Sequence, residues 1–177
     1  MARIAVVSFP ILDEQTLDWI ASIRAEHDPQ AGRILPHFTL VFPIEASPAD
    51  VKNELGRVAA RHEPIPFVIR SAMFMPDAIQ GGGGHVFLVP TEGRANITRI
   101  HDDLYSGVLR PHLREDIAFI PHVTIAAHDD ERWCETYAQR VNGTLEPVGG
   151  VLESITLVDV TASKIETLAR FALGTPS

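Results

Sequence analysis

One short pattern of polar residues occurs twice in the chain, each time inside a segment that is otherwise apolar. The first copy is "ILPHFTL" (34–40), and it aligns with "FIPHVTI" (119–125) at an offset of 85 residues. The matched polar positions and prolines are Pro36 and Pro121, His37 and His122, and Thr39 and Thr124. Because the apolar residues between them recur as well, chance is a poor explanation of the repeat.

Two histidines and two threonines in matched settings could perform acid–base chemistry on a phosphodiester. Side chains alternate across a β-strand, so the histidine and threonine of each copy share one face, and the apolar residues share the other. An imidazole titrates near neutral pH, so one ring can act as a base while the other acts as an acid. The threonine hydroxyls can donate hydrogen bonds to the non-bridging phosphate oxygens. A phosphodiester can be split with these groups and no metal ion.

The hydrophobic pattern predicts strands and helices that would hold the two motifs. Strands are predicted at 2–9, 36–42, 65–75, 85–90, 118–127, 151–160 and 168–174. Helices are predicted at 13–27 with Asp13 as N-cap, at 47–62 with Ser47 as N-cap and Pro48 in the first turn, at 93–113, and at 129–141. The helix at 93–113 has Ile97, Ile100, Leu104, Val108 and Leu109 on one face and is expected to be interrupted or to end near Gly107 and Pro111.

This order of elements is typical of an α+β protein. No linker rich in Pro, Gly or Ser divides the chain, so residues 1–177 are expected to form a single domain with two lobes. If a pseudo-two-fold axis relates the repeats, their polar faces meet across a cleft. The "GGGG" run (81–84) lacks the Lys-Ser or Lys-Thr of a phosphate-binding loop and is predicted to form a hairpin that could act as a flap.

The composition is that of an ordinary globular protein, with 45% hydrophobic and 21% charged residues. The longest apolar runs are too short to cross a bilayer. The net charge of −8 argues against avid binding to long duplex nucleic acid, which depends on neutralising phosphates. The single cysteine, Cys134, excludes an intramolecular disulfide and is predicted to be a packed residue. With no signal-peptide pattern, these features favour a cytoplasmic protein.

The two His-x-Thr-x elements resemble those of the two-histidine (2H) phosphoesterase superfamily, in its 2′-5′ RNA ligase-like and cyclic phosphodiesterase branch. The segments 86–104 ("VFLVPTEGRANITRIHDDL") and 151–160 ("VLESITLVDV") are also similar to that family. The resemblance implies two pseudo-symmetric α/β lobes with antiparallel sheets around a central cleft. It also implies that His37 and His122 are an acid–base pair and that the hydroxyls of Thr39 and Thr124 bind the phosphate.

The expected activity is that of a metal-independent phosphodiesterase acting on a cyclic or 2′,5′-linked phosphate of a nucleotide or short RNA end. No cofactor or metal, no membrane and no second subunit are expected, and activity should be bell-shaped in pH between two pKa values near 6.5. Two alternatives remain open at this point: a non-catalytic module that binds phosphate or an RNA end, and a reversible 2′-5′ RNA ligase. Several members of the branch carry a basic residue where this chain has Ala127, so another arginine could contact the phosphate, or the substrate could differ.

Other histidines and acidic residues are given structural interpretations. The "HDD" sequence occurs at 101–103 and at 128–130, and a metal site is disfavoured because the first lies on a helix side predicted to be exposed and Asp129 and Asp130 are typical of an N-cap. His62, His85 and His112 have no recurring context and are predicted to be surface residues. Phe9 could stack on a base, but core packing is the favoured prediction.

Overall fold

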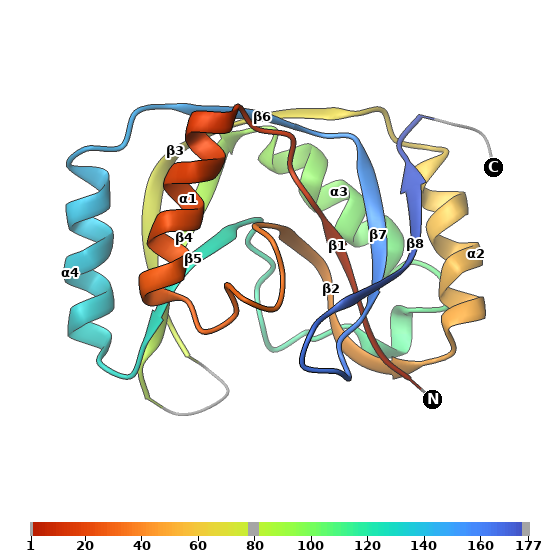
Figure 1. Ribbon diagram of the computed structural model, residues 1–177. Helices are drawn as coiled ribbons and strands as arrows, with labels where there is room; N and C mark the ends of the chain where they lie inside the picture. The colour runs from red at the N-terminus through yellow and green to blue at the C-terminus, as the bar shows by residue number, and fades with distance from the viewer. Residues whose placement is uncertain (1, 78–81, 175–177) are drawn as a thin grey trace.

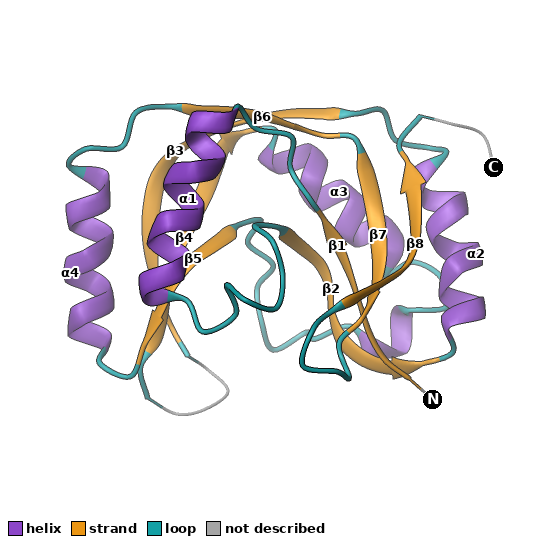
Figure 2. Cartoon of the chain, in the orientation of Figure 1, coloured by secondary structure: helices purple, strands orange, loops and turns teal. Residues whose placement is uncertain are grey.

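A computed structural model of the protein describes residues 2–77 and 82–174, which form one antiparallel sheet with helices packed on it (Figures 1 and 2). The strands are β1 (Ala2–Ser8), β2 (Phe38–Ala46), β3 (Ile65–Pro76), β4 (Gly84–Glu92), β5 (Val123–His128), β6 (Val148–Leu152), β7 (Ser154–Asp159) and β8 (Glu166–Ala172). The helices are α1 (Glu14–His27), α2 (Pro48–Ala59), α3 (Arg94–Leu104), α4 (Glu131–Asn142) and a short 3-10 helix, η1 (Arg110–His112). The predicted α+β class is confirmed.

The strand order is β6-β3-β4-β5-β2-β1-β7-β8, so the sheet consists of two halves of four strands that meet at β5 and β2. In one half α1 connects β1 to β2, and in the other α3 connects β4 to β5, so both halves contain the same strand–helix–strand unit. Figure 1 shows the sheet curling between α4 at one end and α2 at the other. The two predicted lobes are therefore halves of one continuous sheet, with the two motif strands side by side at its centre.

The helices connect the two halves, because two of them follow a strand of one half and pack on the other. Helix α1 follows β1 but lies against β5, and α3 follows β4 and lies against β2 as well as β3 and β4. Helix α4 covers β3, β4 and β5, and α2 covers β7 and β8 (Figure 1). Each motif strand is thus supported by a helix that begins in the opposite half of the sheet.

Local signals explain where the first two helices begin. The Asp13 carboxylate accepts a 2.8 Å hydrogen bond from the backbone N–H of Thr16, which caps α1 as predicted. Pro48 opens α2, where its missing N–H costs nothing, although the Ser47 side chain at the N-cap makes no capping bond. The predicted apolar face of α2 is buried, namely Val51, Leu55, Val58 and Ala59.

One segment differs from the sequence prediction because it changes partners. The strand predicted at 151–160 is two strands, β6 and β7, which are separated at Glu153. β6 pairs with β3 in one half of the sheet, whereas β7 pairs with β1 and β8 in the other. The chain therefore crosses between the halves at Glu153. The pattern of polar and apolar residues through 151–160 resembles that of a single strand, so the sequence does not show where the chain crosses.

Helix α3 holds the first motif strand through a histidine that the sequence placed on an exposed helix side. His101 is only 6% exposed, its Nδ1 lies 2.8 Å from the carbonyl oxygen of Leu40, and its ring stacks on Phe119 at 3.7 Å. The prediction was wrong because the side of α3 that covers β2 includes this imidazole as well as aliphatic residues. The helix ends at Leu104, and Val108, predicted on its apolar face, is 53% exposed.

The back of each motif lies in the main core, as the strand pattern predicts. Phe38 and Val123, which separate the histidine from the threonine in each motif, are both 1% exposed. The Phe38 ring contacts Phe67 edge to face, with centroids 5.2 Å apart. Cys134 is fully buried, which confirms its prediction as a packed residue. Within the described ranges, none of the helices has both the length and the apolar character to cross a membrane.

Candidate active site

The pairing of β2 with β5 brings the two motifs side by side, with their polar residues on the same face of the sheet. The two strands are antiparallel and Phe38 pairs with Val123, the residues that separate histidine from threonine in each motif. Continuing this register by one residue in each direction sets His37 opposite Thr124 and Thr39 opposite His122. The sequence repeat therefore becomes a local two-fold arrangement, in which each imidazole lies beside the hydroxyl of the other motif.

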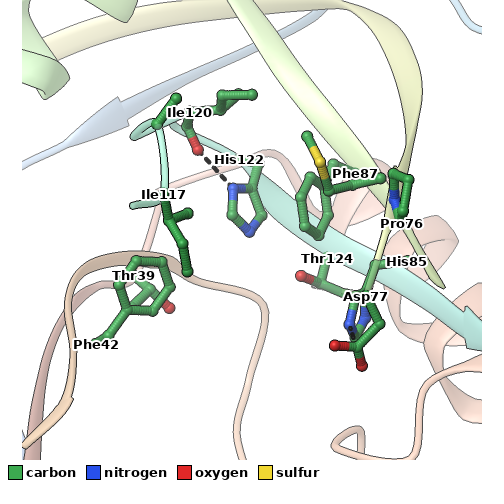
Figure 3. Close-up of a pocket in the computed structure, with 12 residues that line it drawn as sticks. Thr39, Phe42, Pro76, Asp77, His85, Phe87, Ile117, Ile120, His122 and Thr124 are labelled. Atoms are coloured by element: carbon green, nitrogen blue, oxygen red, sulfur yellow. Dashed lines mark hydrogen bonds and ion pairs between the residues drawn. The ribbon is translucent and has the colours of Figure 1, made fainter. Parts of the chain in front are cut away.

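Two adjoining cavities contain the four motif side chains. Thr39, His122 and Thr124 line a cavity of about 290 Å³, shown in Figure 3, and His37 and Thr124 line a second cavity of about 370 Å³. Both cavities are also lined by Asp77 and His85. The structure thus brings together all four residues that the sequence singled out. Of the glycine run at 81–84 that was predicted to form a flap, Gly81 lies outside the described residues, Gly82 and Gly83 have positive φ, and Gly84 begins β4, which pairs with β3 in a hairpin.

The two motif histidines are oriented in the same way. His37 Nδ1 lies 2.8 Å from the carbonyl oxygen of Leu35, and His122 Nδ1 lies 2.6 Å from that of Ile120. A carbonyl only accepts, so Nδ1 must carry the proton in both rings, which leaves Nε2 as the nitrogen for chemistry. A neutral ring then offers a lone pair at Nε2, and a protonated ring offers a proton at the same atom. Either histidine can serve as base or as acid.

Each histidine ring is packed against an aromatic side chain beside the cavity. The ring of His122 stacks on Phe87 with centroids 3.6 Å apart and planes 15° apart. His37 meets the edge of Phe9 at 6.3 Å, so Phe9 contributes to the surroundings of the site. Phe9 is itself half-buried against Ala5, Val7, Ile34 and Val158, in agreement with its predicted packing role.

The surroundings lower the pKa of both imidazoles. Burial disfavours the charged ring of His37 and lowers its pKa, an effect that the hydrogen bond to the Leu35 carbonyl opposes and the nearby charge of Arg24 reinforces. Burial also lowers the pKa of His122, to about 4, with further contributions from the charges of His37 and His85. Both pKa values are therefore expected to lie below the value near 6.5 that the sequence suggested, because a sequence pattern gives no information on the burial of the rings.

The pH dependence of kcat/KM follows from these directions. An acid–base pair made of these two rings would need one protonated and one neutral imidazole, and kcat/KM reports the pKa values of the free protein. Since both values are lowered and one is about 4, the maximum of kcat/KM is expected on the acid side of pH 6.5, with a fall toward higher pH as the acid loses its proton. A bound phosphodiester anion favours the charged ring, so the kcat profile should lie at higher pH. Steady-state kinetics from about pH 4 to 9 checks this, and a kcat/KM maximum above pH 7 would contradict it.

The arginine that lines the second cavity is already engaged in the fold. Arg24 is 3% exposed, its Nε donates a 2.7 Å bond to Asp28, and its Nη2 donates a 2.9 Å bond to the carbonyl oxygen of Ile34. This guanidinium therefore braces the loop that leads into the first motif. Ala127, which stands where several members of the resembled branch carry a basic residue, also lines the second cavity and contributes only a methyl group.

Several residues of the site escaped the sequence prediction. His85 was predicted to lie on the surface, yet it lines both cavities. His62, also predicted to lie on the surface, is outside these cavities, and its Nε2 lies 2.7 Å from the Asp103 carboxylate. No signal within β4 alone distinguishes His85, because its position depends on how β4 pairs with β5. The apolar wall of the first cavity, shown in part in Figure 3, includes Phe42, Met75, Phe87, Ile117 and Ile120. Across residues 2–77 and 82–174, no three His, Cys, Asp or Glu side chains are grouped as metal ligands.

Comparison with known proteins places this arrangement in a family. A Geobacillus kaustophilus protein named "Putative phosphoesterase" is 30% identical over 127 residues, covering 70% of this chain and 68% of that protein. A protein of the same name from Geobacillus thermodenitrificans is 31% identical with the same coverage.

Solved structures share the whole fold. Escherichia coli LigT in complex with 3′-AMP has a TM-score of 0.64 at 18% identity and covers 98% of this chain and 99% of its own. The Thermus thermophilus protein TT0787 has a TM-score of 0.60 at 18% identity and covers 99% of this chain and all of its own. The family model of the 2′-5′ RNA ligase superfamily matches residues 12–163, which is most of the chain. The chain therefore belongs to the 2′-5′ RNA ligase superfamily of 2H phosphoesterases.

Proposed function

We propose that the protein is a metal-independent phosphodiesterase in which His37 and His122 are the acid–base pair and Thr39 and Thr124 bind the phosphate. The observation that carries the proposal is the matched orientation of the two imidazoles, each fixed through Nδ1 by a carbonyl two residues earlier. Binding a phosphate alone would not require two rings that each keep Nε2 for the substrate. The name shared by the curated relatives supports phosphoester chemistry in general.

The proposed reaction on a nucleoside 2′,3′-cyclic phosphate has one chemical step at phosphorus. Nε2 of one histidine takes a proton from water as the water oxygen bonds to phosphorus. The bond from phosphorus to one ribose oxygen breaks, and Nε2–H of the other histidine protonates that oxygen. The product is a nucleoside monophosphate, and the two rings finish with their protonation states exchanged. Thr39 and Thr124 donate hydrogen bonds to the non-bridging oxygens, where negative charge develops.

The walls of the first cavity support a nucleotide as the substrate. Phe42, Phe87, Ile117 and Ile120 provide flat and aliphatic surfaces beside His122, suited to the apolar faces of a nucleobase. LigT, which shares the fold, has been solved with 3′-AMP, a nucleoside monophosphate. We therefore assign the cyclic or 2′,5′-linked phosphate of a nucleotide or short RNA end as the substrate class.

The experiment is hydrolysis of the four nucleoside 2′,3′-cyclic phosphates in EDTA, with 2′- and 3′-phosphate products resolved. The expected result is turnover that EDTA leaves unchanged and a single regioisomer as the product, because the cavities hold the ribose in one orientation. Activity that EDTA abolishes would contradict the mechanism. Tight binding of a nucleoside monophosphate with no turnover on any phosphodiester would favour a binding module instead.

A further inference from the structure

His85 is the third imidazole of the site. It lies on β4, and its side chain, 36% exposed, lines both cavities together with Thr124 and Asp77. In Figure 3 it is drawn beside Thr124 and Asp77, on the side of the cavity opposite Thr39. An imidazole in this position, beside the Thr124 hydroxyl, either contacts the substrate or packs against the cavity wall.

The register between β4 and β5 places His85 and Thr124 of the second motif on the same face of the sheet, where both line the second cavity. His85 pairs directly with Ala127, and Phe87 pairs with Thr124, so β5 carries one more residue than β4 between these two pairs. This bulge reverses the alternation of β5, with Ile125 and Ala126 both buried and Thr124 and Ala127 both facing the cavities. Because Ala127 has only a methyl group, the space above it is left to the cross-strand imidazole.

Neighbouring groups orient the His85 ring. Its Nε2 lies 3.5 Å from Oδ2 of Asp77, and its plane is nearly parallel to the ring of Phe87, with centroids 5.9 Å apart. Phe87 in turn stacks on His122. A doubly protonated imidazole donates from both nitrogens, so the ring can face Asp77 with Nε2 and still have Nδ1 for an anion.

The other charged groups around the second cavity are less suited than His85 to donate a hydrogen bond to a phosphate. Arg24 is bonded to Asp28, His37 is assigned to proton transfer, and Asp77 and Asp129 are carboxylates that repel phosphate. The exposed imidazole of His128 also lines this cavity, and its Nδ1 accepts a 3.0 Å bond from the backbone N–H of Asp130. His85 is the cavity imidazole that lies next to both Thr124 and the ring that stacks on His122.

We propose that His85 is a substrate-binding residue that donates a hydrogen bond to a non-bridging phosphate oxygen, in the space left open by Ala127. The proposal rests on the proposed phosphodiesterase function and adds a third side-chain donor to the two threonine hydroxyls. His85 takes no part in proton transfer, so its loss should weaken binding of the phosphate and leave the acid and base in place.

The test uses His85→Ala and His85→Phe, with His112→Ala on η1 as a matched control outside the cavities. Both His85 variants should raise KM for a 2′,3′-cyclic phosphate, and the dissociation constant for inorganic phosphate, by roughly 10- to 100-fold, as expected for a lost charge-assisted hydrogen bond. At the pH optimum of each variant, kcat should fall by much less than KM rises, because His85 transfers no proton, and the control should match the wild type. Phenylalanine keeps the ring that stacks on Phe87 but removes both nitrogens.

The outcomes separate the possible failures. If His85→Phe behaves as the wild type and only His85→Ala is impaired, His85 packs the wall and the proposal is wrong. Unchanged KM and phosphate affinity in both variants would overturn it as well. If the wild type binds inorganic phosphate but hydrolyses no cyclic phosphate, the proposed function fails, and the phosphate affinities of the His85 variants still decide the role of this residue.

Discussion

Replacing His37 or His122 by alanine is expected to lower kcat for a 2′,3′-cyclic phosphate by about 10²- to 10⁴-fold, the usual contribution of a positioned acid or base. Each ring presents Nε2 on a fixed imidazole, since its Nδ1 is held by the carbonyl of Leu35 or Ile120. In the proposed mechanism, alanine removes the proton carrier on one side of the phosphate. The measurement is steady-state turnover in EDTA, with KM determined separately for each variant.

The fold should survive both substitutions, so the loss can be assigned to chemistry. The two imidazoles are half-buried at the cavities, whereas the core side of each motif is formed by Phe38 and Val123, which stay in place. The His112→Ala variant, outside the cavities, provides a control for the loss of any imidazole. A His37→Ala or His122→Ala protein that keeps its thermal transition and turns over within about three-fold of the wild type would remove that residue from the mechanism.

Replacing Thr39 or Thr124 by valine should lower kcat/KM by about 10²-fold, as for other donors that stabilise charge developing on an oxyanion. Valine keeps the branched shape that suits a strand and loses only the hydroxyl, so stability should change little. Serine at either position keeps the hydroxyl and should retain most of the activity. Kinetics on the four single variants checks this, and valine variants as active as the wild type would mean that other groups hold the phosphate.

The motif pair and the positions of most elements could be predicted from the sequence because the signals are local. The alternation of polar and apolar residues around His37 and His122 reports a strand with two different faces, and the repeat reports two related strands. The N-cap at Asp13 and the apolar face of α2 likewise depend only on residues that are close together in the sequence. A pattern confined to one element is visible without knowledge of its partner.

Features that depend on pairing between distant strands could not be predicted. Counting by two from Thr124 places Ala126 on the cavity face, but the bulge moves Ala127 there and makes His85 its neighbour. The crossing at Glu153 and the burial of His101 against Leu40 also depend on which elements meet in the folded chain. The lowered pKa values have the same origin, because burial of the two rings is a property of the assembled cleft.

Changing the leaving group tests whether, as proposed, one of the two histidines acts as the acid and the other as the base. We would compare the wild type, His37→Ala and His122→Ala on a 2′,3′-cyclic phosphate and on a nucleoside 3′-(p-nitrophenyl phosphate), whose p-nitrophenolate leaves without being protonated. In the proposed acid–base mechanism, both variants are slow on the cyclic phosphate, and one of them, the variant without the acid, regains most of the wild-type rate on the p-nitrophenyl ester. Two variants impaired equally on both substrates would contradict an acid–base pair at His37 and His122.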